Sequence, residues 1–180
     1  ALGIVLGGRI GYAIFYGGDR LAEDPTWLLR LWQGGMSFHG GFLGVLLAMY
    51  LFSRRRGIAF GAVMDFVAPL VPVGLALGRL GNFIGQELWG RPTDVAWGMV
   101  FPRDPLQLAR HPSQLYQFAL EGLLLFVIML WYSAKPRPNW AVAGVFSLGY
   151  GCLRFIAEFF REPDQHIRFQ ALGWMTRGQL

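Results

Sequence analysis

The sequence predicts an all-α, polytopic transmembrane protein. Long apolar runs alternate with short polar stretches, and the mean hydropathy is +0.38. Only 15% of the 180 residues are charged, whereas soluble domains average roughly 25%. The chain also has 25 glycines and seven tryptophans; glycine is frequent in membrane helices, and tryptophan is frequent at membrane surfaces. We therefore expect a single transmembrane domain over residues 1–180, with five spans in this fragment.

The first two predicted spans flank a polar stretch. Residues 1–16 are apolar but short for a span, which fits a chain that lacks its N-terminal part. Arg9 interrupts this run, and we expect it to pair with a neighbouring helix. Residues 18–35 are predicted to form a polar loop, whose tryptophans suit a membrane interface. The second span is predicted over residues 36–52.

Three further apolar runs complete the predicted set of spans. They cover residues 61–84, 115–132 and 141–160. Prolines occur inside the first of these runs, and membrane helices tolerate proline where neighbouring groups satisfy the freed backbone. Residues 85–113 form the longest polar stretch and are predicted to be a small cap outside the membrane. We expect an amphipathic tail from Arg161 and a further span beyond Leu180.

Basic residues predict the orientation of these spans. The loops around 53–57 and 134–139 together contain five Lys or Arg residues and no acidic residue. Cytoplasmic loops carry such an excess of positive charge, so we place both loops in the cytoplasm. Five alternating spans then place the cap and the tail on the opposite, non-cytoplasmic face.

Composition also argues against several classes of protein. The net charge of +5 is scattered or confined to loops, so the basic stripe expected of a nucleic-acid-binding protein is absent. The single cysteine, Cys152, permits no intrachain disulfide, and its apolar neighbours predict a packing role. We find no metal-binding spacing, Gly-x-Ser-x-Gly elbow or phosphate-binding P-loop.

The most informative stretch is GRLGNFIGQELWGR at residues 78–91. It places Arg79 and Asn82 on one helix face at the end of an apolar run, with Glu87 close behind. Its glycines allow a ligand or a second backbone to approach closely. The alternative is an arginine that snorkels to lipid headgroups. The neighbouring Asn82 and Glu87 favour a ligand site instead.

The predicted orientation brings polar residues from three spans to one depth. His39 begins a span at the outer face, and Arg79 ends another there. Arg154 lies thirteen residues after Ala141, or about 20 Å along a helix at roughly 1.5 Å per residue. That distance reaches the outer half of a hydrocarbon core about 30 Å thick. Ionisable residues within a membrane are functional candidates by default.

This set of side chains suits an anionic substrate and a proton transfer. Arg79 and Arg154 can grip a lipid phosphate and stabilise charge on a phosphate leaving group. His39 is a candidate general base, since histidine changes charge near neutral pH. Glu158 lies one turn after Arg154 and can orient its guanidinium. Tyr150 lies one turn before Arg154, where it can donate a hydrogen bond or simply pack.

Each of these residues also has a structural interpretation. His39 can be a helix-start residue bonded to backbone, and the Arg154–Glu158 pair can be a structural salt bridge. His111, before Pro112, is at least as well suited to shaping a loop. Two further acidic residues are predicted to pair helices rather than to catalyse, namely Asp65 and Glu121.

With these residues in place, the chain resembles the bacterial phosphatidylglycerol–prolipoprotein diacylglyceryl transferase family. The resemblance covers nearly all 180 residues, and the 78–91 stretch is its most specific part. The motifs that carry it are GGRIGY (7–12), GGMSFHGG (34–41), GRLGNFIGQELWGR (78–91), RHPSQLY (110–116) and GYGCLRFIAEFFREPD (149–164). The chain departs from the family pattern at Gly85, commonly Asn, and at Gln117, often Glu.

The resemblance implies a bacterial inner-membrane enzyme with seven spans, of which this chain lacks the first and most of the last. Such an enzyme moves the diacylglyceryl group of phosphatidylglycerol to the lipobox cysteine thiol of a prolipoprotein, and glycerol phosphate leaves. It needs no metal and no soluble cofactor, and its partners are these two substrates and membrane lipids.

The resemblance also implies roles for individual residues. Arg79 and Arg154 match the essential phosphate-binding arginines of the family. His39 and Tyr150 match residues important for activity, and we assign the thiol proton to His39. Further motif positions are matched by Asn82, Glu87, Gly90 and Glu158.

Two other functions are considered beside the transferase. An intramembrane protease would use Ser113 or Ser147 with a histidine, but neither serine has the strained, glycine-flanked setting of a nucleophile. A lipid or anion transporter would use the same arginines, and it would favour paired repeats with broken helices. We find no such repeats in the sequence.

Overall fold

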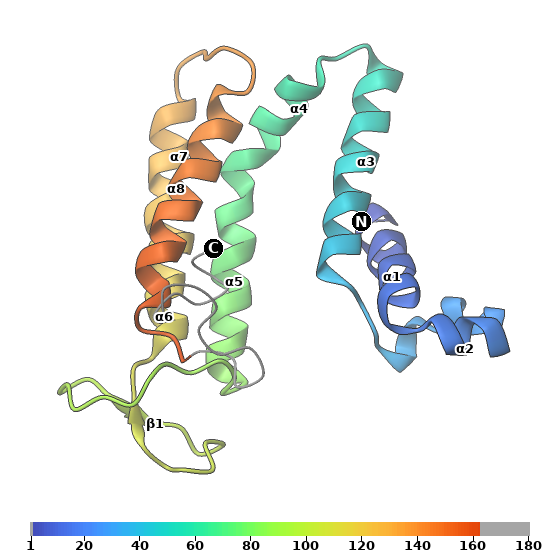
Figure 1. Cartoon of the computed structure of the whole chain (residues 1–180). Coiled ribbons are helices and arrows are strands. Elements are labelled where there is room, and N and C mark those ends of the chain that lie inside the picture. The colour runs from blue at the N-terminus through green and yellow to red at the C-terminus, as the bar shows by residue number, and fades with distance from the viewer. Residues whose placement is uncertain (1, 163–180) are drawn as a thin grey trace, which may run out of the picture. The chain divides into compact units, whose positions relative to one another are not determined.

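The computed structural model describes the backbone of residues 2–162 (Figure 1). Within that range four side chains are not described, those of Asp19, Arg20, Ala22 and Pro25. The tail beyond residue 162 and the span expected after Leu180 lie outside the described residues. The chain divides into two compact units, Ala1–Val63 and Met64–Leu180. Each unit is described by itself.

The first unit is built on two helices, α1 (Leu2–Tyr16) and α3 (Phe38–Arg56), which pack side by side. The predicted polar loop between them is instead a series of short helices. They are α2 (Gly18–Glu23), η1 (Pro25–Leu29) and η2 (Leu31–Gln33). Local hydrogen bonds explain this difference, because the Asp24 side chain accepts from the backbone N–H of Thr26 and caps η1. The loop prediction was therefore wrong in detail.

Glycines form the contact between α1 and α3. Gly7 and Gly11 of α1 face Gly40 of α3 so closely that a methyl group on Gly40 would overlap the Gly7 carbonyl oxygen. Small residues allow membrane helices to approach in this way. Gly7 and Gly11 of the GGRIGY motif and Gly40 of the GGMSFHGG motif thus have a packing role.

We expect Gly40→Ala to lower the free energy of unfolding by about 1–3 kcal/mol, the usual effect of overpacking a tight interface. Gly41→Ala is the matched control, because its new methyl group would lie 3.6 Å from the Ile4 carbonyl oxygen, an ordinary contact distance. Thermal unfolding of the purified protein in detergent compares the two. Equal melting temperatures for both variants would contradict the proposed α1–α3 contact.

The second unit is a bundle of three long helices that lie side by side (Figure 1). The first comprises α4 (Phe60–Val67), η3 (Ala68–Leu70) and α5 (Val71–Ile84), with α4 beginning in the first unit. The second comprises α6 (Ser113–Gln117), the π-helical η4 (Phe118–Leu124) and α7 (Leu125–Ser133). The third is α8 (Ala141–Glu158). The apolar core of the bundle includes Leu125 and Met129, both fully buried.

Helices occupy all five predicted segments, and three of them are long and apolar enough to cross a membrane. These three are Phe60–Ile84, Ser113–Ser133 and Ala141–Glu158. The other two differ for separate reasons: α1 has only 15 residues, and α3 ends in three arginines. The structure is therefore mostly helical with three candidate spans, and the two other spans stay predictions.

Asp65 joins α4 to the start of α8. Its carboxylate accepts hydrogen bonds from the backbone N–H groups of Trp140, at 2.7 Å, and Ala143, at 2.8 Å. A carboxylate is stabilised at a helix N-terminus, where backbone donors are otherwise unpaired. The prediction that Asp65 pairs helices is confirmed.

Cys152 does not pack, contrary to the prediction, because its side chain is exposed. α8 turns Ala143 and Ala157 inward, and both are buried. At roughly 100° per residue, Cys152 falls on the opposite side of the helix from them. Its apolar neighbours in sequence were therefore a poor guide to its burial.

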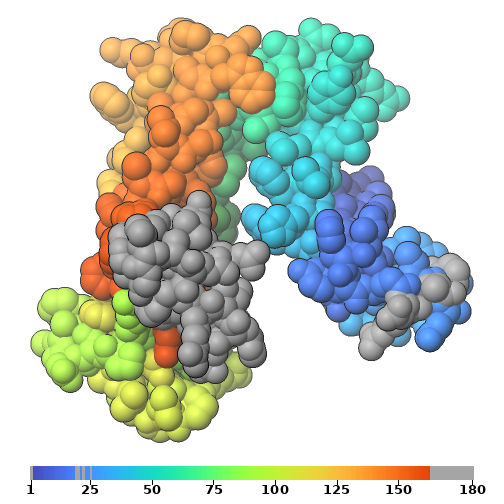
Figure 2. All heavy atoms as spheres, viewed as in Figure 1, coloured from blue at the N-terminus to red at the C-terminus, as the bar shows by residue number. Residues whose placement is uncertain are grey.

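The cap is the segment 85–112 between α5 and α6 (Figure 2). It contains a small departure from the all-α prediction, two antiparallel strands of two residues each. These are β1 (Met99–Val100) and β2 (Ala109–Arg110), with Met99 opposite Arg110. The cap lies at one end of the bundle, and the 134–140 connection lies at the other (Figure 1).

Candidate active site

A buried carboxylate brings together the two arginines that the sequence analysis selected. Glu121, on η4, is fully buried. Its two oxygens lie 3.9 Å from an Nη of Arg79 on α5 and 3.4 Å from an Nη of Arg154 on α8. Three helices therefore meet at this carboxylate. Glu121 was predicted to pair helices, but its contact with both candidate phosphate-binding arginines was not predicted.

Arg154 is held on several sides. It donates to Gln117 Oε1 at 3.0 Å and forms an ion pair with Glu158 at 2.6 Å. Arg161 lies 3.6 Å from the other oxygen of Glu158. The predicted i,i+4 pair of Arg154 and Glu158 is thus present, with the glutamate buried. These contacts fix the direction of the Arg154 guanidinium.

We define the guanidinium cluster as these five connected residues: Arg79, Arg154, Arg161, Glu121 and Glu158. Arg79 and Arg154 thus approach one shared carboxylate from two helices. The side chain of Arg79 is 20% exposed and that of Arg154 is 13% exposed, so both are largely withdrawn from solvent. Two guanidinium groups in such surroundings favour an anionic ligand, because Coulomb attraction strengthens as the dielectric constant falls.

The π-helical segment places Glu121 toward the arginines. η4 spans Phe118–Leu124, and α-helical turns precede and follow it. An inserted π turn changes the direction in which side chains project, and such turns are frequent at functional sites. On the same segment, a methyl group added to Gly122 would lie 2.6 Å from the Ala76 side chain of α5. This tight packing holds η4 against the helix that carries Arg79.

The end of the 78–91 stretch folds back on itself and is tied to α6. Asn82 Nδ2 lies 3.5 Å from Glu87 Oε2, and the Glu87 N–H donates to the Asn82 carbonyl at 2.8 Å. Gln114 and Ser113 donate to the carbonyls of Glu87 and Leu88, at 2.6 and 3.0 Å. Asn82, one turn beyond Arg79, and Glu87, just past the end of α5, are thereby fixed at the cap end of this helix.

Gly90 sits where three segments cross. A methyl group there would lie 2.5 Å from the carbonyl oxygens of both His111 and Phe160. Its N–H donates to the His111 carbonyl at 2.9 Å, and it forms a bridge with Arg161. This geometry supplies a structural reason for glycine at a position that the sequence analysis assigned to substrate binding.

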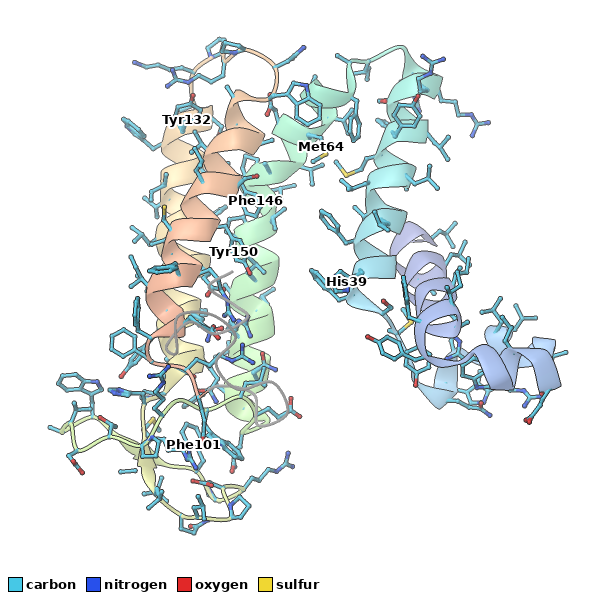
Figure 3. The ribbon with its side chains drawn as sticks, viewed as in Figure 1. His39, Met64, Phe101, Tyr132, Phe146 and Tyr150 are labelled. Carbon is cyan, nitrogen blue, oxygen red and sulfur yellow. The ribbon has the colours of Figure 1, made fainter. Side chains whose placement is uncertain are left out.

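Tyr150 and His39 complete the predicted set. Tyr150 is half-buried on α8, and its ring stacks on Phe146 with centroids 5.9 Å apart (Figure 3). His39 is exposed in the first turn of α3, which Ser37 caps by accepting from the Gly40 N–H at 3.3 Å. It belongs to the first unit, so its membership of this site stays a prediction.

Arg9 pairs with a neighbouring short helix, because it donates to the Trp27 and Leu28 carbonyls of η1. The side chain is 2% exposed and donates to backbone carbonyls of the segment between α1 and α3. The acceptors are Trp27 (2.6 Å), Leu28 (3.1 Å), Arg30 (3.0 Å), Gly34 and Gly35 (3.3 Å). Its guanidinium also lies 4.3 Å from the Trp27 ring centroid. Arg9 therefore organises this segment rather than a ligand site.

An ion network anchors the cap to the end of α8. Asp104 and Arg110 are buried and lie 2.6 Å apart, and Arg110 also pairs with Glu162. Hydrogen bonding from Arg110 lowers the pKa of Asp104 below its ordinary value of 3.8. The same contact raises the pKa of Arg110. Both groups are therefore charged at neutral pH.

The lowered pKa of Asp104 predicts that acid loosens the cap. A carboxylate whose folded pKa is depressed contributes stability above its unfolded pKa and loses it as the pH falls through the folded value. We expect the protection of cap amides against hydrogen exchange, relative to their intrinsic exchange rate at each pH, to fall below about pH 4, the unfolded pKa of an aspartate. Asp104→Asn should exchange faster at neutral pH and lose this dependence. Asp94→Asn, an exposed cap residue, should behave as wild type.

The serines of the protease alternative have structural partners. Ser113 is fully buried and donates to Leu88, and Ser147 donates to the Ala143 carbonyl one turn earlier at 3.0 Å. Among the residues that the structure describes, no group of three or more His, Cys, Asp or Glu side chains could hold a metal ion.

Comparison with known proteins agrees with the motif resemblance. The family model described as "Prolipoprotein diacylglyceryl transferase" matches residues 1–180. The chain is 63% identical over 179 residues to a phosphatidylglycerol–prolipoprotein diacylglyceryl transferase of Teredinibacter turnerae, covering 99% of this chain and 62% of that protein. It is 58% identical over 180 residues to proteins of the same name from Azotobacter vinelandii and a Marinomonas species, with 100% of this chain covered. The chain spans 68% and 67% of those two relatives.

Proposed function

Since the chain belongs to the prolipoprotein diacylglyceryl transferase family, we propose that it transfers the diacylglyceryl group of phosphatidylglycerol to the lipobox cysteine thiol of a prolipoprotein. The guanidinium cluster is the observation that carries this proposal. Phosphatidylglycerol has one phosphodiester charge, and the cluster presents two largely buried guanidinium groups, those of Arg79 and Arg154, beside one shared carboxylate. An enzyme acting on this lipid needs such a site within the depth of the membrane.

The two arginines divide the binding task. The Arg154 guanidinium is held in place by Gln117 and Glu158 and provides a fixed positive charge at one side of the site. Arg79 reaches only to 3.9 Å from Glu121, which leaves its guanidinium edge for the lipid phosphate. A planar guanidinium presents paired donors that match two phosphate oxygens. Asn82 and Glu87, with Gly90 behind them, form the cap-side wall of the headgroup site.

The reaction is a displacement at the glyceryl carbon that bears the phosphate. The cysteine sulfur forms a C–S bond to that carbon while the C–O bond to the phosphate breaks, and the bonding electrons pass to the departing phosphate oxygen. Glycerol phosphate leaves with the added negative charge, which Arg79 and Arg154 stabilise. His39 accepts the thiol proton, and Tyr150, one turn from Arg154, donates to the phosphate. The nucleophile belongs to the substrate, so the exposed Cys152 has no role in this step.

We place this chemistry on the periplasmic side of the bacterial inner membrane. The loops 53–57 and 134–139 carry the excess of basic residues and are assigned to the cytoplasm. The cap lies at the other end of the bundle from residues 134–140, next to the end of α5 (Figure 1). With α1 and α3 as the remaining two spans, the chain crosses the membrane five times, and both basic loops then lie on the side opposite the cap.

Incubation of the purified protein with phosphatidylglycerol vesicles and a lipobox peptide tests the proposal. Mass spectrometry of the peptide and thin-layer chromatography of the lipid separate the three functions considered. A peptide carrying a diacylglyceryl thioether supports the transferase, and a cleaved peptide indicates a protease. An unmodified peptide with anion or lipid movement across the vesicle membrane indicates a transporter and would overturn the proposal.

A further inference from the structure

Glu121 has features that a simple helix-pairing residue does not need. It is fully buried in the second long helix of the bundle and contacts arginines from both of the other helices. Its Oε2 atom is buried without a hydrogen-bond partner among the described residues. An unsatisfied buried carboxylate oxygen is costly, so its retention calls for an explanation.

The two arginines cannot share a site without a counter-charge. Arg79 and Arg154 come from different helices, and two guanidinium groups repel strongly when they are withdrawn from solvent. Glu121 lies between them, with one oxygen toward each. Glu158 pairs with Arg154 through one oxygen and with Arg161 through the other, whereas the two oxygens of Glu121 lie toward Arg79 and Arg154.

We propose that Glu121 is a positioning residue that sets the spacing of Arg79 and Arg154 and limits the positive charge of their site. This inference rests on the proposed function, because the spacing matters for a phosphodiester that must be gripped and then released. Removing the charge of Glu121 would make the site more positive by one charge, because this carboxylate lies against both arginines. The more positive site would hold the departing phosphomonoester dianion more tightly.

The proposal predicts opposite effects on turnover and on anion affinity. In Glu121→Gln, which preserves the shape of the side chain, we expect kcat to fall by about 100-fold because a misplaced catalytic group costs about that factor. The KM for phosphatidylglycerol should not rise. Glycerol phosphate, the product, should inhibit at least about fivefold more strongly, which corresponds to the lower end of typical coupling between sites. If Glu121 had only a structural role, Glu121→Gln would instead bind both phosphatidylglycerol and glycerol phosphate more weakly.

Glu121→Asp separates position from charge. It retains the carboxylate but shortens it by one methylene group, so kcat should fall by about tenfold while glycerol phosphate inhibits as in wild type. Calorimetric binding of glycerol phosphate to the purified proteins gives a second readout that does not require turnover. If the wild-type protein does not lipidate the lipobox peptide, the proposed function is overturned. The binding of glycerol phosphate would still test the role of Glu121 in that case. Equal or weaker binding by Glu121→Gln would overturn the role given to Glu121.

Discussion

Replacing Arg79 by alanine is expected to lower diacylglyceryl transfer by at least about 100-fold, because removal of one charge-stabilising donor commonly costs 10²–10³ in rate. Arg79 has a single long ion contact within the described structure, to Glu121 at 3.9 Å. Its loss therefore removes a ligand contact more than a structural one. The protein should still insert and fold, and its melting temperature should stay close to that of wild type.

Two further variants define the cause of this loss. Arg79→Lys keeps the charge but lacks the planar fork of donors, so we expect activity between those of wild type and alanine. Arg137→Ala is the matched control, since Arg137 lies in the exposed connection at the opposite end of the bundle and donates to the Tyr132 carbonyl. It should retain full activity. Near-normal turnover by Arg79→Ala would remove the phosphate-binding role from this residue.

The helices were predictable because their signal is local. Apolar runs, their length and the basic residues that end α3 all lie within a single segment, and helices occur in each of the five places. The one-turn spacing of Arg154 and Glu158 belongs to the same kind of signal, and the ion pair is present. Cys152 could also have been placed correctly, because helix geometry sets it opposite Ala143 and Ala157.

The missed features depend on contacts that no single segment encodes. Glu121 is one acid in an apolar run, and it lies more than 30 positions from both Arg79 and Arg154 in the sequence. Only the packing of three helices shows that these residues meet. Arg9 likewise bonds carbonyls that are 18 to 26 positions away, supplied by short helical turns that have no clear periodicity. The π turn at η4 has no comparable sequence signal either.

Gly90 illustrates a different limit of sequence interpretation. A glycine in a specific motif is compatible both with ligand approach and with a crossing of backbones. The structure supplies the second explanation, through carbonyl oxygens from His111 and Phe160 that leave no space for a methyl group. Motif membership therefore identifies positions that matter without identifying what each one does.

His39→Gln is expected to lower transfer by about 100-fold or more, within the usual contribution of a positioned general base. Glutamine retains hydrogen-bonding capacity but cannot accept a proton near neutral pH. The wild-type rate should rise with pH as the His39 imidazole becomes able to accept the thiol proton. The variant should lack this rise. Initial rates measured on phosphatidylglycerol vesicles at matched lipid concentration provide both quantities.

His111→Gln is the control for an effect that any histidine replacement would have on the pH profile. His111 Nδ1 lies 3.1 Å from the Tyr116 hydroxyl, and its ring contacts Phe160, so its contacts are within the second unit. It should retain the wild-type pH profile even if its overall rate falls. If His39→Gln also keeps the wild-type profile, another group removes the thiol proton. A flattened profile for His39→Gln alone would place the start of α3 at the reacting thiol, and the first unit would then contribute directly to the chemistry.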